Sequence, residues 1–289
     1  MEDVQRRELV PTRDLKLSVV APAYNEQESI GDFVAEMCET LGATGAPYEL
    51  IVVDDGSSDG TWQTLRGLQA RFPALRPAAL EKNSGQSAAL AAGVSLARGQ
   101  FIGLIDADMQ NDPADIGKML QMLLERSDLD CLVGVRAERQ DNWLRRISSR
   151  IANAVGEWIT GEAIRDAGCA VKVCRAEFLK RVGFFRGAHR FLGTLVKMEG
   201  GRVEELLVNH RPRQKGVSKY GSGLGRTFVA LRDAFGVRWM MDRKIRYAIK
   251  PLPMDPVEGA TDSQRSQQIT RSLREAQNVR PNRLASDLS

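Results

Sequence analysis

The sequence predicts an α/β protein with one mostly parallel sheet flanked by helices. Short apolar runs rich in β-branched residues alternate with stretches whose apolar residues recur at helical spacing. Proline, glycine or aspartate follows most of the runs, where a turn is expected. Strands that alternate with helices along a chain form parallel sheets through right-handed crossovers. The 289 residues, 43% of them hydrophobic, suffice for one large domain or two small ones.

Four strand–helix units are expected in the first half of the chain. They comprise strand 17–21 with helix 26–41, strand 49–53 with helix 61–72, strand 77–80 with helix 87–97, and strand 101–105 with helix 113–127. Further elements are a strand at 131–135, an Arg-rich helical stretch at 143–160 and a strand near 170–174. In such sheets ligands gather beyond the carboxyl ends of the strands. The unusual polar clusters of this chain follow those ends.

Charge and cysteine content restrict the classes of function. A net charge of +4 is too weak to indicate nucleic acid, so no such partner is expected. Residues 197–250 contain 13 Lys and Arg but only five Asp and Glu, which indicates an anionic ligand for the second half. The cysteines lack Cys-x-x-Cys spacing and only two histidines are present, so no zinc site is expected. We expect reduced thiols in a cytosolic protein at Cys38, Cys131, Cys169 and Cys174.

Both ends of the chain are polar. Residues 1–16 are charged rather than apolar, so we expect no signal peptide. The most apolar helical stretch, 228–241, contains Arg232, Asp233 and Arg238, and no membrane-spanning helix is expected. Residues 251–289 contain no aromatic side chain and many Ser, Gln and Arg, which predicts a disordered tail.

Two adjacent carboxylates, Asp54 and Asp55, end the second expected strand and precede Gly56. Acidic residues at a strand end contact the ribose or base in nucleotide-binding folds. The alternative is that they only cap the helix that begins near Thr61. Taken alone, this motif is therefore weak evidence for a nucleotide site.

Asp106 and Asp108 flank Ala107 directly after the fourth expected strand. Both carboxylates can converge on one point where the chain leaves the sheet, and such oxygens suit Mg²⁺ or Mn²⁺. Diphosphate oxygens and water would complete the metal shell, with Gln110 as a further ligand. The alternative is a pair of cap residues for the helix that opens near residue 113.

A third polar segment, Pro22 to Glu26, follows the first expected strand. Tyr24 offers a flat face beside a base or sugar, and Glu26 offers a carboxylate near a ribose. Taken alone, Tyr24 is more typical of a packing residue. The combination with the two aspartate motifs is what favours a nucleotide-sugar site.

These three segments, with Asn83 to Gln86 between them, resemble the family 2 glycosyltransferases, which have the GT-A fold. Asp106 to Pro113 is similar to the Asp-x-Asp-x-Gln-x-x-Pro segment of the polyprenyl-phosphate sugar transferases, the dolichyl-phosphate mannose synthase group. Further matches, in the same order, are Gly134 to Arg136, the cluster Arg145, Arg146 and Arg150, Asp166 with Gly168, His189 to Phe191, and Arg211 to Tyr220. The similarity covers residues 15–237.

The resemblance implies a role for each matching residue. The nucleotide-sugar-binding residues would be Pro22, Tyr24, Glu26, Asp54, Asp55, Gly56, Asn83, Gln86, Asp106 and Ala107. Mg²⁺ or Mn²⁺ would be held by Asp106, Asp108 and Gln110. The acceptor phosphate would meet Arg136, Arg150, Arg213, Ser218 and Lys219, and the catalytic residues would be Asp108, Arg136 and Asp166.

The implied reaction is the inverting, metal-dependent transfer of a hexosyl unit from GDP-mannose or a UDP-sugar to dolichyl or undecaprenyl phosphate. Negative charge develops on the leaving diphosphate, where a divalent cation and arginines stabilise it. A lipid phosphate is already anionic at neutral pH, whereas a sugar hydroxyl requires a general base. Apart from Asp166, residues 160–190 contain no acidic motif of the Glu-Asp kind to serve as that base.

The basic stretch 211–219 suits a phosphate ligand, although a solvated loop is the alternative. The glycines within 214–226 make that segment flexible enough to close over a bound donor. Many members of the group carry membrane helices after the catalytic domain, where this sequence has an amphipathic, basic stretch at 227–250. Such a helix can lie in a membrane interface or dock on the domain's core or a partner. Its expected apolar face comprises Phe228, Leu231, Phe235, Trp239 and Met240.

The expected organisation is a GT-A domain at 15–226, divided into a nucleotide-binding half (17–113) and an acceptor half (114–226), followed by the helix at 227–250. We expect a cytoplasmic protein, peripheral on the cytoplasmic face of the membrane through a membrane surface or membrane-protein partner. The sequence leaves the oligomeric state open, a homo-oligomer included.

Two alternatives to lipid-phosphate transfer stay open. One is a family 2 enzyme that acts on a saccharide hydroxyl in cell-surface polysaccharide synthesis, with Asp166 as the base. The other is a non-catalytic nucleotide-sugar-binding subunit. An aspartyl-phosphate phosphatase usually has its Asp-x-Asp motif near the N-terminus, and a dinucleotide oxidoreductase needs a Gly-x-Gly-x-x-Gly turn that this chain lacks.

Overall fold

The computed structural model describes residues 15–136, 166, 168–212 and 224–245. The chain divides into two compact units, Met1–Asp242 and Arg243–Ser289. The sheet and the helices packed on it belong to the first unit. Within the described residues, no helix combines the length and the apolar character needed to cross a membrane.

One sheet contains seven strands among the described residues, in the order β3-β2-β1-β4-β6-β5-β7. The strands are β1 (Leu17–Ala23), β2 (Tyr48–Asp54), β3 (Leu75–Ala79), β4 (Phe101–Leu104), β5 (Cys131–Arg136), β6 (Lys172–Arg175) and β7 (Val203–Val208). Only β6 runs against its neighbours, pairing antiparallel with both β4 and β5. The predicted mostly parallel sheet is therefore confirmed.

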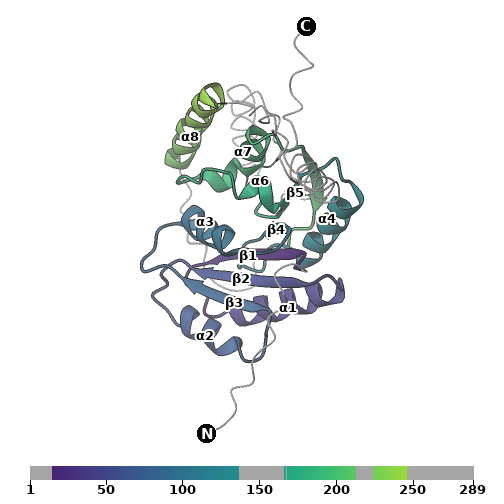
Figure 1. The fold of residues 1–289 in the computed structure, drawn as a ribbon. Coiled ribbons are helices and arrows are strands. Elements are labelled where there is room, and N and C mark those ends of the chain that lie inside the picture. Colours follow the sequence, from purple (N-terminus) through teal and green to yellow (C-terminus); the bar gives the residue numbers. More distant parts are fainter. Residues whose placement is uncertain (1–14, 137–165, 167, 213–223, 246–289) are drawn as a thin grey trace, which may run out of the picture. The chain divides into compact units, whose positions relative to one another are not determined.

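Helices cover both faces of the sheet and bury one apolar cluster on each (Figure 1). The first face carries α1 (Ile30–Ala43), α2 (Thr61–Leu68) and α4 (Pro113–Glu125). The second face carries α3 (Gln86–Leu96), α6 (Ala176–Leu179), α7 (Leu192–Met198) and α8 (Leu224–Arg243). The short helix η1 (Ala188–Arg190) precedes α7. In α3, a Cβ on Gly93 would lie 2.2 Å from Val20, so glycine allows this helix to pack directly on β1.

Most predicted elements exist, but some boundaries were wrong. The first strand continues through Pro22 to Ala23. The register of β4 on β1 ends at Val20, so the missing N–H of Pro22 falls beyond that ladder. Helix α1 begins at Ile30 rather than 26, and α2 ends at Leu68 rather than 72. The sequence did not predict β7, α6, η1 or α7, and the stretch 143–160 lies outside the described residues.

The expectation of four reduced thiols is wrong for one pair. Cys131 and Cys174 form a disulfide between β5 and β6. They are direct partners in the antiparallel register of these strands, which sequence spacing does not reveal. Cys38 and Cys169 are free thiols.

The expected single apolar face of the C-terminal helix is also wrong. In α8, Leu231 and Met240 pack against the core of the domain. Phe235 and Trp239 are 58% and 61% exposed. The side chain of Phe228 lies outside the described residues, as does the predicted tail at 251–289. The predicted domain boundary at 226/227 falls inside α8.

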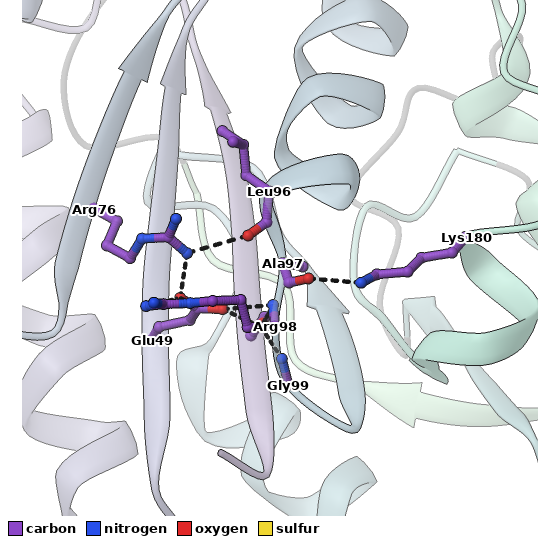
Figure 2. A network of polar contacts seen from close by, with 8 residues as sticks. Glu49, Arg76, Leu96, Ala97, Arg98, Gly99 and Lys180 are labelled. Atoms are coloured by element: carbon purple, nitrogen blue, oxygen red, sulfur yellow. Dashed lines mark hydrogen bonds and ion pairs between the residues drawn. The ribbon is translucent and has the colours of Figure 1, made fainter. Parts of the chain in front are cut away.

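A buried carboxylate organises the amino-terminal edge of the sheet (Figure 2). Glu49 in β2 is 2% exposed and accepts hydrogen bonds from the Ser18 hydroxyl at 2.6 Å and the Arg98 backbone N–H at 2.8 Å. The guanidinium groups of Arg98 and Arg76 form ion pairs with the same carboxylate. These contacts attach the connection between α3 and β4 to strand β2.

Candidate functional site

The candidate site lies at the carboxyl edge of the sheet. The carboxyl ends of β1, β2, β3, β4 and β5 share this edge because these strands are mutually parallel, and antiparallel β6 begins there. Every predicted site residue that the structure describes lies near this edge, either in the last residues of a strand or in a segment joined to a strand there. Pro22 is within β1, Tyr24 follows it, and Ala107 is buried just beyond β4.

The turn after β1 and the turn after β2 hold each other through side chains. Asn25 has a left-handed backbone (φ 52), a conformation that asparagine tolerates better than most residues. Its N–H donates to the Ser57 hydroxyl at 2.8 Å, and its side-chain oxygen accepts the Ser58 N–H at 2.8 Å. Asp54 accepts the Ser57 N–H at 3.2 Å. The residues on these two turns that the sequence predicts to bind the nucleotide are thus positioned relative to each other.

Glu26 has a structural contact in addition to its predicted role. Its backbone N–H donates to the Thr61 hydroxyl at 2.9 Å, and its carboxylate accepts the Ser29 hydroxyl at 2.9 Å. Glu26 therefore lies where α1 and α2 begin. Whether it also contacts a ribose stays a prediction.

Asp55 and Gly56 fix the loop before α3. Asp55 is 3% exposed, and its two carboxylate oxygens accept the backbone N–H groups of Ser84 and Gly85 at 2.8 and 2.9 Å. Asp55 thus binds a protein loop, which is a contact that the ligand role predicted from sequence did not include.

Gly56 is the position where this turn requires glycine. It has φ 65, and a Cβ there would lie 2.4 Å from the Lys82 carbonyl carbon and 2.5 Å from the Asn83 nitrogen. The turn after β2 therefore touches the backbone of the Asn83 loop. This explains the glycine physically and places Asn83 at the same edge as the aspartates.

The Asp106 carboxylate just beyond β4 contacts the start of α3. Gln86, the first residue of α3, donates from Nε2 to Asp106 Oδ1 at 2.7 Å. Burial raises the pKa of Asp106 to about 7, and the neighbouring carboxylate of Asp108 adds to the rise. Lys172, the Gln86 hydrogen bond and Arg136 act in the opposite direction. A carboxylate whose charge is disfavoured by burial and by a neighbouring carboxylate is suited to binding a cation.

The chain reverses sharply after this aspartate pair. Met109 has a left-handed backbone (φ 62), an uncommon conformation for a residue with a long side chain. The Gln110 N–H donates to Asp108 Oδ1 at 3.1 Å across the same turn. This turn places Gln110 beside Asp108, although the sequence contained no sign of the strained backbone at Met109.

The donor set fits a divalent metal only with help from a ligand. Within the described part of the chain, no group of three or more His, Cys, Asp and Glu side chains surrounds one point. Asp106, Asp108 and Gln110 offer hard oxygen atoms, which suit Mg²⁺ or Mn²⁺ when diphosphate oxygens and water complete the shell. These residues therefore fit a divalent metal whose remaining ligands would come from a diphosphate and water.

Arg136 and Asp166 form a two-point ion pair beside the aspartates. Arg136 donates from Nε and an Nη to the two Asp166 oxygens at 2.7 and 2.8 Å, and from its backbone N–H at 3.3 Å. Asp166 is 2% exposed. The structure thus brings these two predicted catalytic residues together, with both carboxylate oxygens of Asp166 bound by arginine.

Two residues near this site were not assigned a role from sequence. Lys172, 3% exposed at the start of β6, donates to the Cys169 carbonyl, and burial lowers its pKa while Cys169 and Asp106 raise it. A lysine inside an apolar strand was the signal available for it. His189 Nδ1 lies 2.8 Å from the Ser87 hydroxyl, which links η1 to the start of α3. Of the predicted acceptor residues, Arg150, Arg213, Ser218 and Lys219 lie outside the described residues.

Comparison with known proteins identifies the family. Residues 18–183 match the model for glycosyl transferase family 2. The dodecaprenyl-phosphate galacturonate synthase of Rhizobium johnstonii is 41% identical over 240 residues, covering 82% of this chain and 70% of that protein. The undecaprenyl-phosphate 4-deoxy-4-formamido-L-arabinose transferase of Edwardsiella ictaluri is 35% identical over 208 residues, covering 71% of this chain and 63% of that protein.

Solved structures share the fold at lower sequence identity. Mannosyl-3-phosphoglycerate synthase from Rubrobacter xylanophilus has a TM-score of 0.61 at 18% identity, over 86% of this chain and 79% of that one. Glucosyl-3-phosphoglycerate synthase from Mycobacterium tuberculosis, solved with Mn²⁺, UDP and its product, has a TM-score of 0.57 at 16% identity, over 80% and 81%. The GT-A fold expected from the sequence is confirmed. The chain belongs to glycosyltransferase family 2 and is a glycosyltransferase.

Proposed function

We propose that this enzyme transfers a sugar from a nucleoside diphosphate to a polyprenyl phosphate. The observation behind this choice of acceptor is the ion pair between Arg136 and Asp166. Both carboxylate oxygens of Asp166 accept hydrogen bonds from one guanidinium. A general base must reach the proton that it removes. Asp166 is poorly placed to activate a sugar hydroxyl, whereas a phosphate monoester needs no base.

The relatives support the same acceptor class. The names of these two relatives each contain a polyprenyl phosphate, dodecaprenyl phosphate in one and undecaprenyl phosphate in the other. The sugars in these two names differ, being a galacturonate and a 4-deoxy-4-formamido-L-arabinose, so the names do not indicate one donor sugar for this chain. The proposal is therefore for the acceptor class, and the assay below identifies the donor sugar.

The chemistry is a single displacement with inversion. An acceptor phosphate oxygen bonds to the anomeric carbon, the bond from that carbon to the diphosphate oxygen breaks, and the nucleoside diphosphate leaves. Mg²⁺ or Mn²⁺, held by Asp106, Asp108 and Gln110, would offset the negative charge of the diphosphate. Arg136 adds positive charge at the same edge, and the Tyr24 and Asp54 turns would hold the nucleoside.

The exposed side of α8 is proposed to meet the membrane that holds the acceptor. Phe235 and Trp239 lie one helical turn apart and are both more than half exposed. Arg232 and Arg238 are exposed on the same helix. Aromatic side chains with neighbouring cations are typical of helices that lie in a membrane interface.

The direct test is an extraction assay with the full-length chain. It is incubated with Mn²⁺ or Mg²⁺, undecaprenyl or dolichyl phosphate, and radiolabelled GDP-mannose, UDP-glucose or UDP-galacturonate. The proposal expects label in the organic phase with one donor, and none with the Asp108→Ala variant. Absence of lipid-extractable label with every donor contradicts it.

Two other outcomes identify the alternatives. Label transferred to a water-soluble saccharide, with a loss of that label in Asp166→Asn, supports a hydroxyl acceptor. Calorimetric binding of a nucleotide sugar without any product supports a non-catalytic subunit.

A further inference from the structure

The segment that follows β7 is joined to the metal motif by its backbone. Asn111 and His210 form an antiparallel bridge, and the Arg211 N–H donates to the Gln110 carbonyl at 2.7 Å. Nearly one hundred residues separate these positions in sequence. The loop that holds a predicted metal ligand, Gln110, is therefore paired with a distant part of the chain.

Side chains strengthen this pairing at the start of α4. Asp112 is the N-cap of α4 and accepts the Ala114 N–H at 3.0 Å. Arg211 binds Asp112 at 3.1 Å through one Nη and Glu36 of α1 at 2.5 Å through the other. Asn209 donates from Nδ2 to Asp112 at 3.3 Å. One arginine thus joins α1, the cap of α4 and the loop beside Gln110.

The loop needs such support because its own backbone is strained. Met109 holds a left-handed conformation between Asp108 and Gln110, and a non-glycine residue stays there only when the surroundings hold it. A metal site loses affinity when its ligands are free to reorient. The contacts of Arg211 act on the residues immediately after the strained turn.

We propose that Arg211 is a positioning residue for the metal site: by binding Asp112 and Glu36 it holds the turn that carries Asp108 and Gln110. This inference rests on the proposed metal role of the aspartate motif. In this inference Arg211 acts through its ion pairs with Asp112 and Glu36.

The chain supplies a matched control at the other end of α4. Arg126 follows the helix and binds Glu204 of β7 at 2.5 Å and Asp128 at 3.2 Å. The side chains of Arg126 and Arg211 are 36% and 33% exposed. Arg126→Gln and Arg211→Gln therefore remove similar ion pairs, one far from the metal motif and one next to it.

The test measures Mn²⁺ binding rather than turnover. Free Mn²⁺ is followed by electron paramagnetic resonance while each protein is titrated with Mn²⁺, in the presence of UDP and, separately, GDP. Arg211→Gln is expected to raise the apparent Kd for Mn²⁺ roughly tenfold, the usual effect of removing a group that supports metal ligands. Arg126→Gln is expected to leave the Kd unchanged. Thermal unfolding of both variants measures their general loss of stability.

A second variant covers the case in which Arg211→Gln does not fold. Asp112→Asn keeps a side-chain oxygen for the cap, since asparagine caps helices as well as aspartate does, but removes the charge that Arg211 binds. It is expected to raise the Kd in the same direction, and Arg211→Lys is expected to fall between Arg211→Gln and the wild type. Wild-type Kd in the folded Arg211→Gln or Asp112→Asn protein overturns the inference, as does an equal rise in Arg126→Gln.

The proposed metal site is checked separately with Asp108→Ala. Loss of Mn²⁺ binding in Asp108→Ala beside wild-type binding in Arg211→Gln overturns only the positioning role. Wild-type binding in Asp108→Ala overturns the metal assignment, and the positioning role with it.

Discussion

Replacing Asp166 by asparagine separates the two acceptor chemistries, because the residue would act differently in each. As a general base it would remove the proton of a sugar hydroxyl. As the partner of Arg136 it would only hold a guanidinium in place. Asparagine keeps one side-chain oxygen for Arg136 but cannot accept a proton at neutral pH.

The loss of transfer rate expected for Asp166→Asn differs enough between the two roles to tell them apart. Loss of a general base lowers the rate by about 10²–10⁴-fold, or roughly 3–5 kcal/mol of activation free energy. Loss of one charge-assisted hydrogen bond between Asp166 and Arg136 costs about 1.5–3 kcal/mol of unfolding free energy. For domains of this size that corresponds to roughly 2–4 °C in melting temperature per kcal/mol. We expect Asp166→Asn to lower the melting temperature while transfer to polyprenyl phosphate falls no more than about tenfold, or 1.4 kcal/mol.

The assay is a double-mutant cycle with Arg136→Gln. Initial rates of formation of lipid-extractable product are measured for the wild type, both single variants and the double variant. Circular dichroism checks that each protein is folded. If Asp166 acts only through Arg136, its replacement has no further effect once Arg136 is absent. A loss above about 10²-fold in Asp166→Asn that persists in the Arg136→Gln background would refute the reasoning, since that is the effect of a base.

Three further predictions follow from the structure. Asp108→Ala is expected to abolish transfer in a protein that still folds, and EDTA to stop transfer until Mn²⁺ is added back; retained activity in either case contradicts the metal assignment. Glu49→Gln is expected to lower the free energy of unfolding at pH 7 by about 3 kcal/mol, because it leaves two arginines without their buried partner. Burial alone would raise the pKa of Glu49, but hydrogen bonds from Ser18, Arg98 and Arg76 lower it. A carboxylate whose pKa is lowered by folding stabilises the fold above its ordinary pKa of 4.5, and this contribution is lost as the pH falls through its pKa in the folded protein. The difference in unfolding free energy between the wild type and Glu49→Gln, measured in urea, should therefore shrink below that pH. A difference that does not depend on pH would contradict this. The double variant Phe235→Ser, Trp239→Ser is expected to lose the co-sedimentation with anionic lipid vesicles that the wild type shows. The control variant Leu124→Ser, at a surface leucine that is 46% exposed, is expected to keep it. Equal sedimentation of the wild type and both variants contradicts the membrane contact.

Local sequence patterns were sufficient to predict most strands and helices of the nucleotide-binding half. The runs around Val19, Val52 and Ile102 are fully buried strands, as their apolar character indicates. Asp54 and Asp106 lie at or just past strand ends, where the alternation of strands and helices predicted them. Local sequence patterns were insufficient to predict β7. Its residues are mostly half-buried at the edge of the sheet, so its hydrophobic residues do not follow a clear periodic pattern.

The sequence by itself determined the order of strands and helices in the nucleotide-binding half, the edge of the sheet where the polar motifs gather, and the family. These depend on residues close together in the chain, whose spacing and type are visible directly. Only the tertiary structure decided which distant side chains meet: Asp166 with Arg136 and Arg211 with Asp112 as ion pairs, and Cys131 with Cys174 as a disulfide. Each of these contacts joins distant segments through the direction of β6 or the register of β5 and β7. Strand direction and register result from packing across the whole sheet, and no local period encodes them.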